Sequence, residues 1–406
     1  MRQLFVSVAA LAACCGTSLA GPDRVAIGDA QKNDFRVVSD TEIYLGETRF
    51  NSWQELADSG HFYQEHTRCA IPKDVDVDPA LRVPSDCSAS LTRVLGAYDP
   101  SVDTYRIPVV VHILRSTNGT GDMPDSRVTS QIEILNEDFL ALAGTNGANG
   151  NDAQIEFYLA TEDPAGNPTN GITRTTNNTW FNDGGTYYNS LAWDPDRYLN
   201  IYTNSASGAL GYVPFLPQTS PGSVGSNSDR VVVLYSSFGR NAPLSPFNQG
   251  RTTTHEVGHY LGLFHTFDGG CGTSSCYNTG DLICDTNRES GPVFGCPGNP
   301  VSCGSSDPKD NYMDYSDDLC MEQFTYEQTN RMRCTLLNYR TDLYEVVSSA
   351  CFADCDGNGA LNVDDVDCWV AGFLASDLAV ADCDGNGSLN VDDVDCFVAA
   401  FVAGCP

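Results

Sequence analysis

Apolar positions along the chain follow two spacings that separate predicted strands from predicted helices. Residues 107 to 114 form a near-continuous apolar run, which is typical of a strand buried on both faces. Residues 125 to 139 place apolar side chains at helical spacing, and Asp125 is the predicted N-cap. Shorter strand patterns lie between loops rich in Gly, Asn and Ser, at residues 155 to 159, 198 to 202 and 230 to 235. This order predicts an α/β (α+β) domain with a mixed sheet.

A short segment in the second half of the chain reads HExxHxxGxxH. On a helix, His255 and His259 project from one face, where two neutral imidazoles can bind Zn²⁺. Gly262 lets the helix end with a positive φ, so that the returning chain brings in His265 as the third ligand. The fourth position stays open for water, as in a catalytic rather than a structural zinc site. Glu256 lies where it can act as the general base.

A second motif, NYMDY, begins at residue 311 and resembles the Met-turn of metzincins. In that turn Met313 would form a soft hydrophobic floor under the three imidazoles. With the zinc motif, the segments Gly280-Asp281, Asp285-Thr286, Asn311 to Met321 and Phe324-Thr325 resemble the pappalysin family, especially its ulilysin-like branch. The resemblance covers about residues 105 to 345. It implies a metzincin-like zinc protease fold with an active-site helix, in secreted endopeptidases that also bind calcium.

The resemblance also implies roles for single residues. Tyr315 would stabilise the oxyanion of the tetrahedral intermediate, with a packed aromatic in the turn as the alternative. Asp318 would lie at the base of the S1′ pocket and favour Arg, and less so Lys, after the scissile bond; the alternative is a solvated loop carboxylate. Asp281, Asp285 and Thr286 would hold calcium beside the cleft, or else form an ordinary turn.

The start of the chain reads as a leader for export. A charged start and an apolar run lead to Ser18-Leu19-Ala20, which predicts a signal peptide at residues 1–20. The alternative is a bacterial lipobox that ends at Cys14 and would tether the protein by a lipid. No other stretch is apolar enough for a transmembrane segment. Fifteen of the 17 cysteines lie beyond the leader, which fits an oxidising compartment. The family resemblance suggests the bridges Cys296–Cys320 and either Cys271–Cys303 or Cys276–Cys303.

Residues 21–103 carry none of the catalytic motifs and are predicted to be a propeptide, followed by the catalytic domain at 104–347. The segment TRCAIP resembles the family's cysteine switch, in which the Cys69 thiolate fills the open zinc position. A disulfide between Cys69 and Cys87 is the alternative.

The tail, residues 351–406, repeats one acidic loop and contains no Lys or Arg. The segment DCDGNGALNVDD returns 28 residues later as DCDGNGSLNVDD, and each copy has the oxygen ligands and the glycine of a calcium loop. The predicted calcium ligands are Asp354, Asp356, Asn358, Ala360 (main-chain carbonyl), Asn362 and Asp365 in the first copy, and Asp382, Asp384, Asn386, Ser388 (main-chain carbonyl), Asn390 and Asp393 in the second.

Each loop ends in Asp and is followed by one apolar helical segment, which resembles a dockerin type I module. The tail is therefore predicted to be a small all-α domain with EF-hand-like loops. Dockerins bind cohesin domains, so a cohesin-like or cell-surface docking partner is one expectation, and a purely structural calcium module is the other. Cysteine spacing suggests the bridges Cys355–Cys368 and Cys383–Cys396, with Cys351 and Cys405 closing the ends.

The leading hypothesis is a secreted zinc metalloendopeptidase that hydrolyses protein or peptide substrates and uses Zn²⁺ and Ca²⁺. Its rivals are a surface adhesion or scaffold-docking protein with a structural zinc site, and a zinc hydrolase of non-peptide substrates. Glu256 favours catalysis, because a structural zinc site has no need of a base. The net charge of −31 excludes a typical nucleic-acid-binding protein, which needs a basic surface.

Overall fold

A computed structural model describes residues 35–71, 87–88, 91–92, 96–98, 100, 103–273, 275–348, 352–356, 361–383 and 387–404. The predicted leader, with Cys14, lies outside these residues, and so do Asn358, Ala360, Asp384 and Asn386 of the predicted calcium loops and the proposed Cys351–Cys405 clasp. Within the described part of the chain, no helix is both long enough and apolar enough to cross a membrane.

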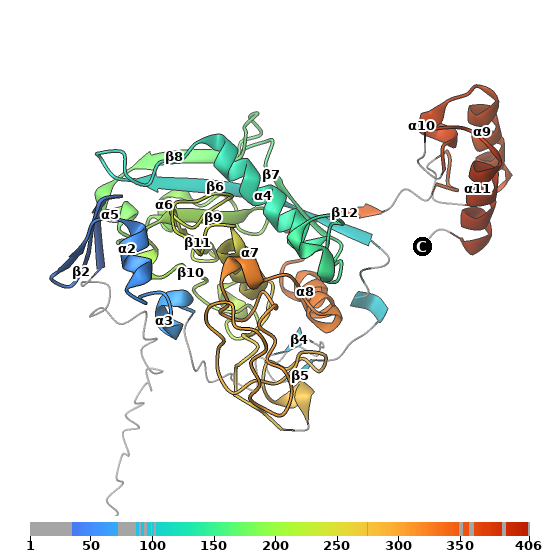
Figure 1. The fold of residues 1–406 in the computed structure, drawn as a ribbon. Helices are drawn as coiled ribbons and strands as arrows, with labels where there is room; N and C mark the ends of the chain where they lie inside the picture. Colours follow the sequence, from blue (N-terminus) through green and yellow to red (C-terminus); the bar gives the residue numbers. More distant parts are fainter. Residues whose placement is uncertain are drawn as a thin grey trace, which may run out of the picture.

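A mixed seven-stranded sheet forms the centre of the molecule, with strand order β10-β11-β9-β6-β12 and with β7 and β8 paired to β6 (Figure 1). The 13-residue β6 is the longest strand, and it pairs in parallel with β7, β8 and β9. Strand β10 lies at one edge and pairs antiparallel with β11. The strands span Asp103–Arg115 (β6), Ile155–Leu159 (β7), Ile172–Thr176 (β8), Leu199–Asn204 (β9), Gly211–Tyr212 (β10), Val231–Leu234 (β11) and Glu345–Ser348 (β12).

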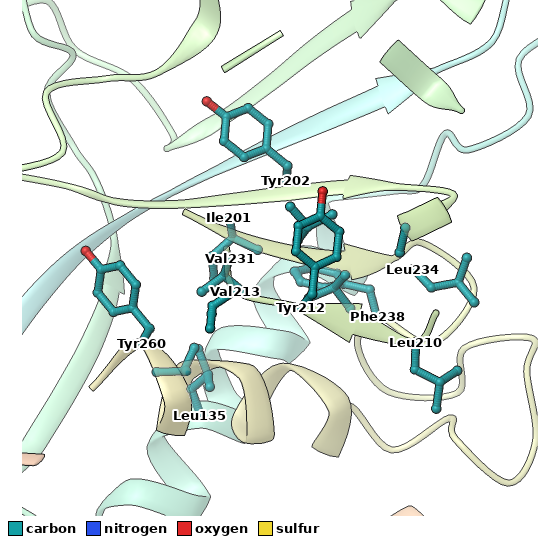
Figure 2. Close-up of a cluster of buried hydrophobic side chains, with 14 of the residues drawn as sticks. Leu135, Ile201, Tyr202, Leu210, Tyr212, Val213, Val231, Leu234, Phe238 and Tyr260 are labelled. Atoms are coloured by element: carbon teal, nitrogen blue, oxygen red, sulfur yellow. The ribbon is translucent and has the colours of Figure 1, made fainter. Parts of the chain in front are cut away.

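Two helices pack on one side of this sheet and enclose the main core. Helix α4 (Asp125–Phe139) packs on β7, and α7 (Arg251–Tyr260) packs on β11 and on α4. Figure 2 shows Leu135 of α4 and Tyr260 of α7 beside Ile201 and Val231 of the sheet; all four are fully or almost fully buried. The predicted helix at 125–139 is confirmed, but Asp125 is its first residue and not its cap. Pro124 holds the cap position, and the Asp125 carboxylate pairs instead with Arg174.

The chain after α7 consists mainly of loops before α8 (Tyr326–Tyr339), drawn in yellow to orange in Figure 1. These loops have little regular backbone pairing, and three disulfides hold them: Cys271–Cys303, Cys276–Cys284 and Cys296–Cys320. The first and third are the bridges that the family resemblance suggested. The Cys276–Cys284 bridge was not predicted.

The segment before the sheet packs into the same core as the α/β domain. It contains a three-stranded antiparallel sheet and two short helices. Further along, Cys87 of β4 bonds to Cys334 of α8, so the predicted alternative of a Cys69–Cys87 disulfide is wrong and Cys69 is a free thiol. These elements span Phe35–Ser39 (β1), Glu42–Leu45 (β2), Thr48–Phe50 (β3), Trp53–Asp58 (α2), Glu65–Arg68 (α3), Cys87–Ser88 (β4) and Leu91–Thr92 (β5).

The C-terminal helices have a small hydrophobic core of their own. They span Val363–Leu374 (α9), Leu378–Ala381 (α10) and Val391–Ala403 (α11). The rings of Trp369 and Phe397 stack with their centroids 4.6 Å apart and join α9 to α11. The Cys355–Cys368 and Cys383–Cys396 disulfides form as predicted and tie each loop to the helix that follows it.

Candidate metal centre

Three histidines meet at the C-terminal half of α7. The Nε2 atom of His259 lies 3.1 Å from that of His255 and 3.0 Å from that of His265. The helix ends as the sequence predicted, because Gly262 has φ = +91° and turns the chain back towards His265. A Cβ atom at Gly262 would lie 2.4 Å from Thr335 Oγ1, so the turn requires glycine for space as well as for its backbone conformation.

Main-chain carbonyls fix the protonation of two of these rings. Nδ1 of His255 lies 2.7 Å from Tyr312 O, and Nδ1 of His259 lies 2.8 Å from Leu263 O. A carbonyl oxygen only accepts, so both Nδ1 atoms carry the hydrogen and both Nε2 atoms present lone pairs. Two buried lone pairs facing each other at 3.1 Å repel unless a cation lies between them. The distances between the Nε2 atoms are close to the roughly 3.3 Å that separates two nitrogen ligands of tetrahedral zinc with Zn–N bonds of about 2.0–2.1 Å. The donor set therefore fits zinc.

The Met-turn lies directly beneath α7. Met313 is fully buried, and a Cβ atom at Gly258 would lie 2.5 Å from its Sδ atom. The glycine inside the helix therefore lets the methionine approach the backbone closely. The Tyr315 hydroxyl lies 3.1 Å from Nε2 of His265, so this tyrosine reaches the metal centre as well as packing in the turn.

Glu256 is completely buried beside the three histidines. Burial raises the pKa of its carboxyl to about 8. Its Oε2 atom accepts from the Cys69 thiol at 3.5 Å, and its Oε1 atom has no hydrogen-bond partner among the described residues. A Cβ atom at Gly211 of β10 would lie 2.7 Å from Glu256 Cγ, so glycine at the sheet edge makes room for this carboxylate.

Cys69 comes to the same point from the N-terminal segment. One ligand atom from each of Cys69 and the three histidines lies within 4.8 Å of the others. Burial and the neighbouring Glu256 charge raise the pKa of the thiol well above its ordinary value. The segment lies along the sheet edge, with Cys69 bridged in parallel to Gly211 and with Ala70 N donating to Gly211 O at 3.0 Å.

Arg68 was not singled out from the sequence, yet its side chain is buried in the loops below α7. One of its terminal nitrogens donates to Ser316 O at 2.8 Å, and its guanidinium lies 4.7 Å from the centre of the Phe247 ring. Asp318 is fully buried, which contradicts the alternative of a solvated carboxylate. Burial raises the pKa of Asp318, and the Arg68 charge is the largest influence in the opposite direction.

Asp318 also borders open space. Its Oδ2 atom accepts from the main-chain N–H groups of Gln249 and Arg251, at 2.8 and 3.2 Å. Its Oδ1 atom has no partner in the described part of the chain. A cavity of about 370 Å³ lies against it, lined by Glu137, Arg240 and Arg251 among others. A buried carboxylate with a free oxygen beside a cavity is suited to a cationic side chain.

Two further carboxylates are buried together beside the Met-turn. Glu289 accepts from Thr266 Oγ1 at 2.5 Å, and Asp314 accepts from Val293 N at 3.0 Å. Burial, and then the charge of Asp314, raise the pKa of Glu289 to about 9. Burial raises the pKa of Asp314 to about 7. These two groups therefore resist carrying two negative charges at neutral pH.

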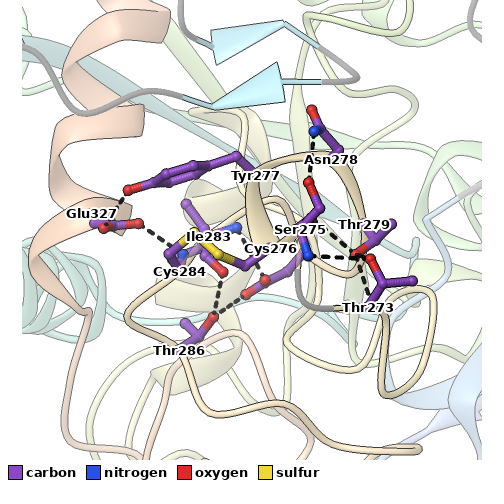
Figure 3. The surroundings of a disulfide bond; sticks show 11 residues. Thr273, Ser275, Cys276, Tyr277, Asn278, Thr279, Ile283, Cys284, Thr286 and Glu327 are labelled. Carbon is purple, nitrogen blue, oxygen red and sulfur yellow. Dashed lines mark hydrogen bonds between the residues drawn. A yellow bond between two sulfur atoms is a disulfide. The ribbon is translucent and has the colours of Figure 1, made fainter.

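Thr286, one of the predicted calcium residues beside the cleft, lies near the Cys276–Cys284 disulfide (Figure 3). Asp281 accepts from Thr286 Oγ1 at 2.7 Å, and Asp285 accepts from Glu327 N at 2.9 Å. Glu327, which the sequence did not single out, accepts from Tyr277 OH and from Cys284 N. The carboxylates of Asp281 and Asp285 thus hold the local turn in this structure.

In the C-terminal module, carboxylate oxygens of Asp354, Asp356 and Asp365 lie within 4.8 Å of one another. Asp365 also accepts from Asn362 N at 2.9 Å. The second copy repeats that contact, because Asp393 accepts from Asn390 N at 2.8 Å. The described members of the two loops therefore share one local arrangement, including a capping box at the start of each helix.

The sheet, the HExxHxxGxxH helix and the Met-turn define a metallopeptidase of the metzincin kind. The family model described as Pregnancy-associated plasma protein-A matches residues 186–337. The "Extracellular metalloprotease" of Colletotrichum graminicola is 36% identical over 245 residues, which covers 58% of this chain and 78% of that protein. "Extracellular metalloprotease 1" of Coccidioides posadasii is 34% identical over 252 residues, which covers 60% and 82%.

Solved structures agree with these relatives. A mutant form of promirolysin from Tannerella forsythia is 37% identical, with a TM-score of 0.51, and the match covers 61% of this chain and 85% of that one. Mirolysin in complex with compound 9 is also 37% identical, with a TM-score of 0.50, and the match covers 60% and 98%. The chain belongs to the Pregnancy-associated plasma protein-A (pappalysin) family, and it is a metalloprotease.

Proposed function

We propose that this protein is a secreted zinc-dependent endopeptidase whose N-terminal segment keeps it latent. One observation carries the proposal: two buried imidazoles, with protons held on Nδ1 by carbonyls, aim their Nε2 lone pairs at one point together with His265. His255, His259 and His265 would hold the metal. Secretion is supported by relatives named extracellular metalloproteases and by the predicted signal peptide at residues 1–20.

The chemistry would divide between the metal and two side chains. When bound, zinc supplies a Lewis acid that polarises the substrate carbonyl and lowers the pKa of water to about 7. Glu256 takes a proton from the water that attacks the peptide carbonyl, and later passes it to the nitrogen of the leaving amine as the C–N bond breaks. The Tyr315 hydroxyl donates a hydrogen bond to the oxyanion of the tetrahedral intermediate.

Latency would come from Cys69. Its sulfur lies close to all three histidines and to Glu256, so it would occupy the position of the attacking water. Removal of the segment that carries Cys69 then opens the site. We assign residues 21–103 to the propeptide and 104–347 to the catalytic domain. The Cys87–Cys334 disulfide would keep the stretch around Cys87 attached to α8 whichever side of it is cut.

Specificity for Arg, and less so Lys, after the scissile bond would come from Asp318. The protein's own Arg68 supports this assignment, because its guanidinium is buried in the same region and its charge acts on Asp318. A guanidinium offers a planar donor fork that a carboxylate can receive, which explains the preference over Lys.

The C-terminal repeat would bind Ca²⁺ in both loops and serve as a dockerin-like anchor to a cohesin-like or cell-surface partner. The clustered carboxylates of the first loop and the repeated Asn–Asp capping boxes support the calcium part. Asp281 and Thr286 are proposed as a further calcium site beside the cleft, where both are buried and in contact.

A Glu256→Gln variant tests the peptidase proposal. It keeps the shape of the side chain but removes the base, so it should retain zinc and the fold and should lose cleavage of an unbiased peptide library. Turnover close to that of the parent would contradict the mechanism. A parent protein that binds zinc but cleaves no peptide would favour the adhesion or docking alternative. Chelator-sensitive turnover of small esters or amides alone would favour a non-peptide hydrolase.

A further inference from the structure

A buried carboxylate on α4 joins the two elements that make the metal centre. Asp138 is completely buried. Its Oδ2 atom accepts from Thr254 Oγ1 at 2.6 Å, and its Oδ1 atom accepts from Tyr312 OH at 2.8 Å. Arg251, also buried, places a terminal nitrogen 3.3 Å from Oδ1. One carboxylate thus receives two donors from the first turn of α7 and a third donor from the Met-turn.

The partners of Asp138 stand next to the ligands. Thr254 immediately precedes His255 on α7. Tyr312 immediately precedes Met313, and its main-chain oxygen accepts from Nδ1 of His255 at 2.7 Å. Asp138 therefore holds Tyr312 by the hydroxyl end of its side chain while the carbonyl of the same residue holds the His255 ring.

The chemistry of the group suits a fixed role. Burial raises the pKa of Asp138 to about 6, and the Arg251 charge opposes that rise. A buried carboxylate is tolerated when charge and hydrogen bonds surround it, and removal of one partner leaves the others unsatisfied. Such a network has one preferred geometry, which it imposes on the segments it joins.

Resting on the proposed zinc peptidase function, we infer that Asp138 is a positioning residue for the metal centre. By tying Tyr312 to the first turn of α7, it sets the distance between the Tyr312 carbonyl and His255 and so aims the Nε2 lone pair at the metal. The contacts of Asp138 are with Thr254, Tyr312 and Arg251, so it would touch neither substrate nor metal. Groups that orient a metal-bound histidine in this way typically change metal affinity or activity by about 10- to 100-fold when they are removed.

The test compares Asp138→Asn and Tyr312→Phe with Glu133→Gln, a change at an exposed position of the same helix. Asparagine keeps the shape of the side chain but lacks the charge for Arg251 and turns an amide nitrogen towards one donor. Phenylalanine removes only the hydroxyl and leaves the Tyr312 carbonyl in place, so it serves where Asp138→Asn fails to fold. The readouts on the full chain are zinc affinity by chelator competition and the visible spectrum of the Co²⁺-substituted protein. On the activated enzyme, kcat and KM are measured.

Asp138→Asn should weaken zinc binding by about 10- to 100-fold, alter the cobalt spectrum and lower kcat with little change in KM. Tyr312→Phe should act in the same direction. The double variant should lose less zinc affinity than the two single losses combined, because both changes disrupt the same contact between Asp138 and the Tyr312 hydroxyl. A fall in thermal stability alone, with zinc affinity and cobalt spectrum unchanged in both variants, would overturn the inference. A parent chain without zinc or cleavage would instead overturn the proposed function.

Discussion

Replacement of Arg68 by Ala tests how the N-terminal segment is held in the active site. Arg68 is only 4% exposed, and its guanidinium contacts the Ser316 carbonyl and the Phe247 ring. Alanine removes these contacts and the positive charge near the buried Asp318. Cys69 and the edge-strand hydrogen bonds around it stay in place.

The size of the effect follows from the contacts that are lost. A hydrogen bond to a charged group contributes about 1.5–3 kcal/mol, and a desolvated cation–π contact contributes up to about 2 kcal/mol. These contributions overlap, and a reasonable combined loss is about 2–4 kcal/mol. Since about 1.4 kcal/mol is a factor of ten, the balance between docked and open segment should shift by roughly 30- to 1000-fold towards open.

The assay is the onset of cleavage of an Arg-containing fluorogenic peptide by the purified full chain. Arg68→Ala should shorten the lag markedly, and Arg68→Lys should lie between it and the parent, because lysine keeps the charge but not the planar fork. Arg36→Ala is the matched control. Arg36 is an exposed arginine in the same segment and, like Arg68, it lies over an aromatic ring, in this case that of Tyr44. An unchanged lag in Arg68→Ala, under conditions where Cys69→Ala is active at once, would refute the reasoning. An equal effect of Arg36→Ala would refute it too.

Two more predictions concern charge and calcium. The raised pKa values of Glu289 and Asp314 mean that their contribution to stability is fully present below the ordinary carboxyl pKa of about 4, and that it falls as pH rises from there until it is lost at about pH 7 to 9. Between pH 6.5 and 9, the free energy of unfolding of Glu289→Gln should therefore fall by about 1–2 kcal/mol less than that of the parent, and its Tm by some 2–8 °C less. Glu133→Gln should follow the parent. Parallel Tm curves for all three proteins would count against the buried pair. Calcium should raise the melting temperature of the C-terminal module, and Asp365→Asn combined with Asp393→Asn should abolish that rise because each replaces the loop's last carboxylate. A calcium-induced shift that survives the double change would place the ion elsewhere.

The sequence was most informative where one local pattern determines the structure. The spacing of His255 and His259, the positive φ at Gly262 and the apolar run of β6 all depend on neighbours within a few residues, and the structure has each of them. The 28-residue repeat likewise predicted one helix after each loop, and the structure adds an equivalent capping box at the start of both helices. The capping rule failed where a tertiary contact competed with it. Asp125 pairs with Arg174 of β8, and Pro124 holds the cap position.

Long-range contacts were beyond sequence reasoning. Asp138 lies more than a hundred residues from Thr254 and Tyr312, and nothing in its own surroundings marks it as buried beside them. The Cys87–Cys334 bond spans 247 residues, and one sequence allows many pairings of its cysteines. Arg68 had one available signal, its place directly before Cys69 in a segment expected to enter the active site.

The central claim is that three histidines hold one zinc ion at the end of α7. Anomalous diffraction from crystals of the full chain, collected on either side of the zinc absorption edge, tests it directly. The account predicts a single strong peak, present only above the edge, about 2.0–2.1 Å from Nε2 of His255, His259 and His265 and close to the Cys69 sulfur. Absence of zinc from that point in crystals grown with the metal, or a peak that His265 does not contact, would contradict it.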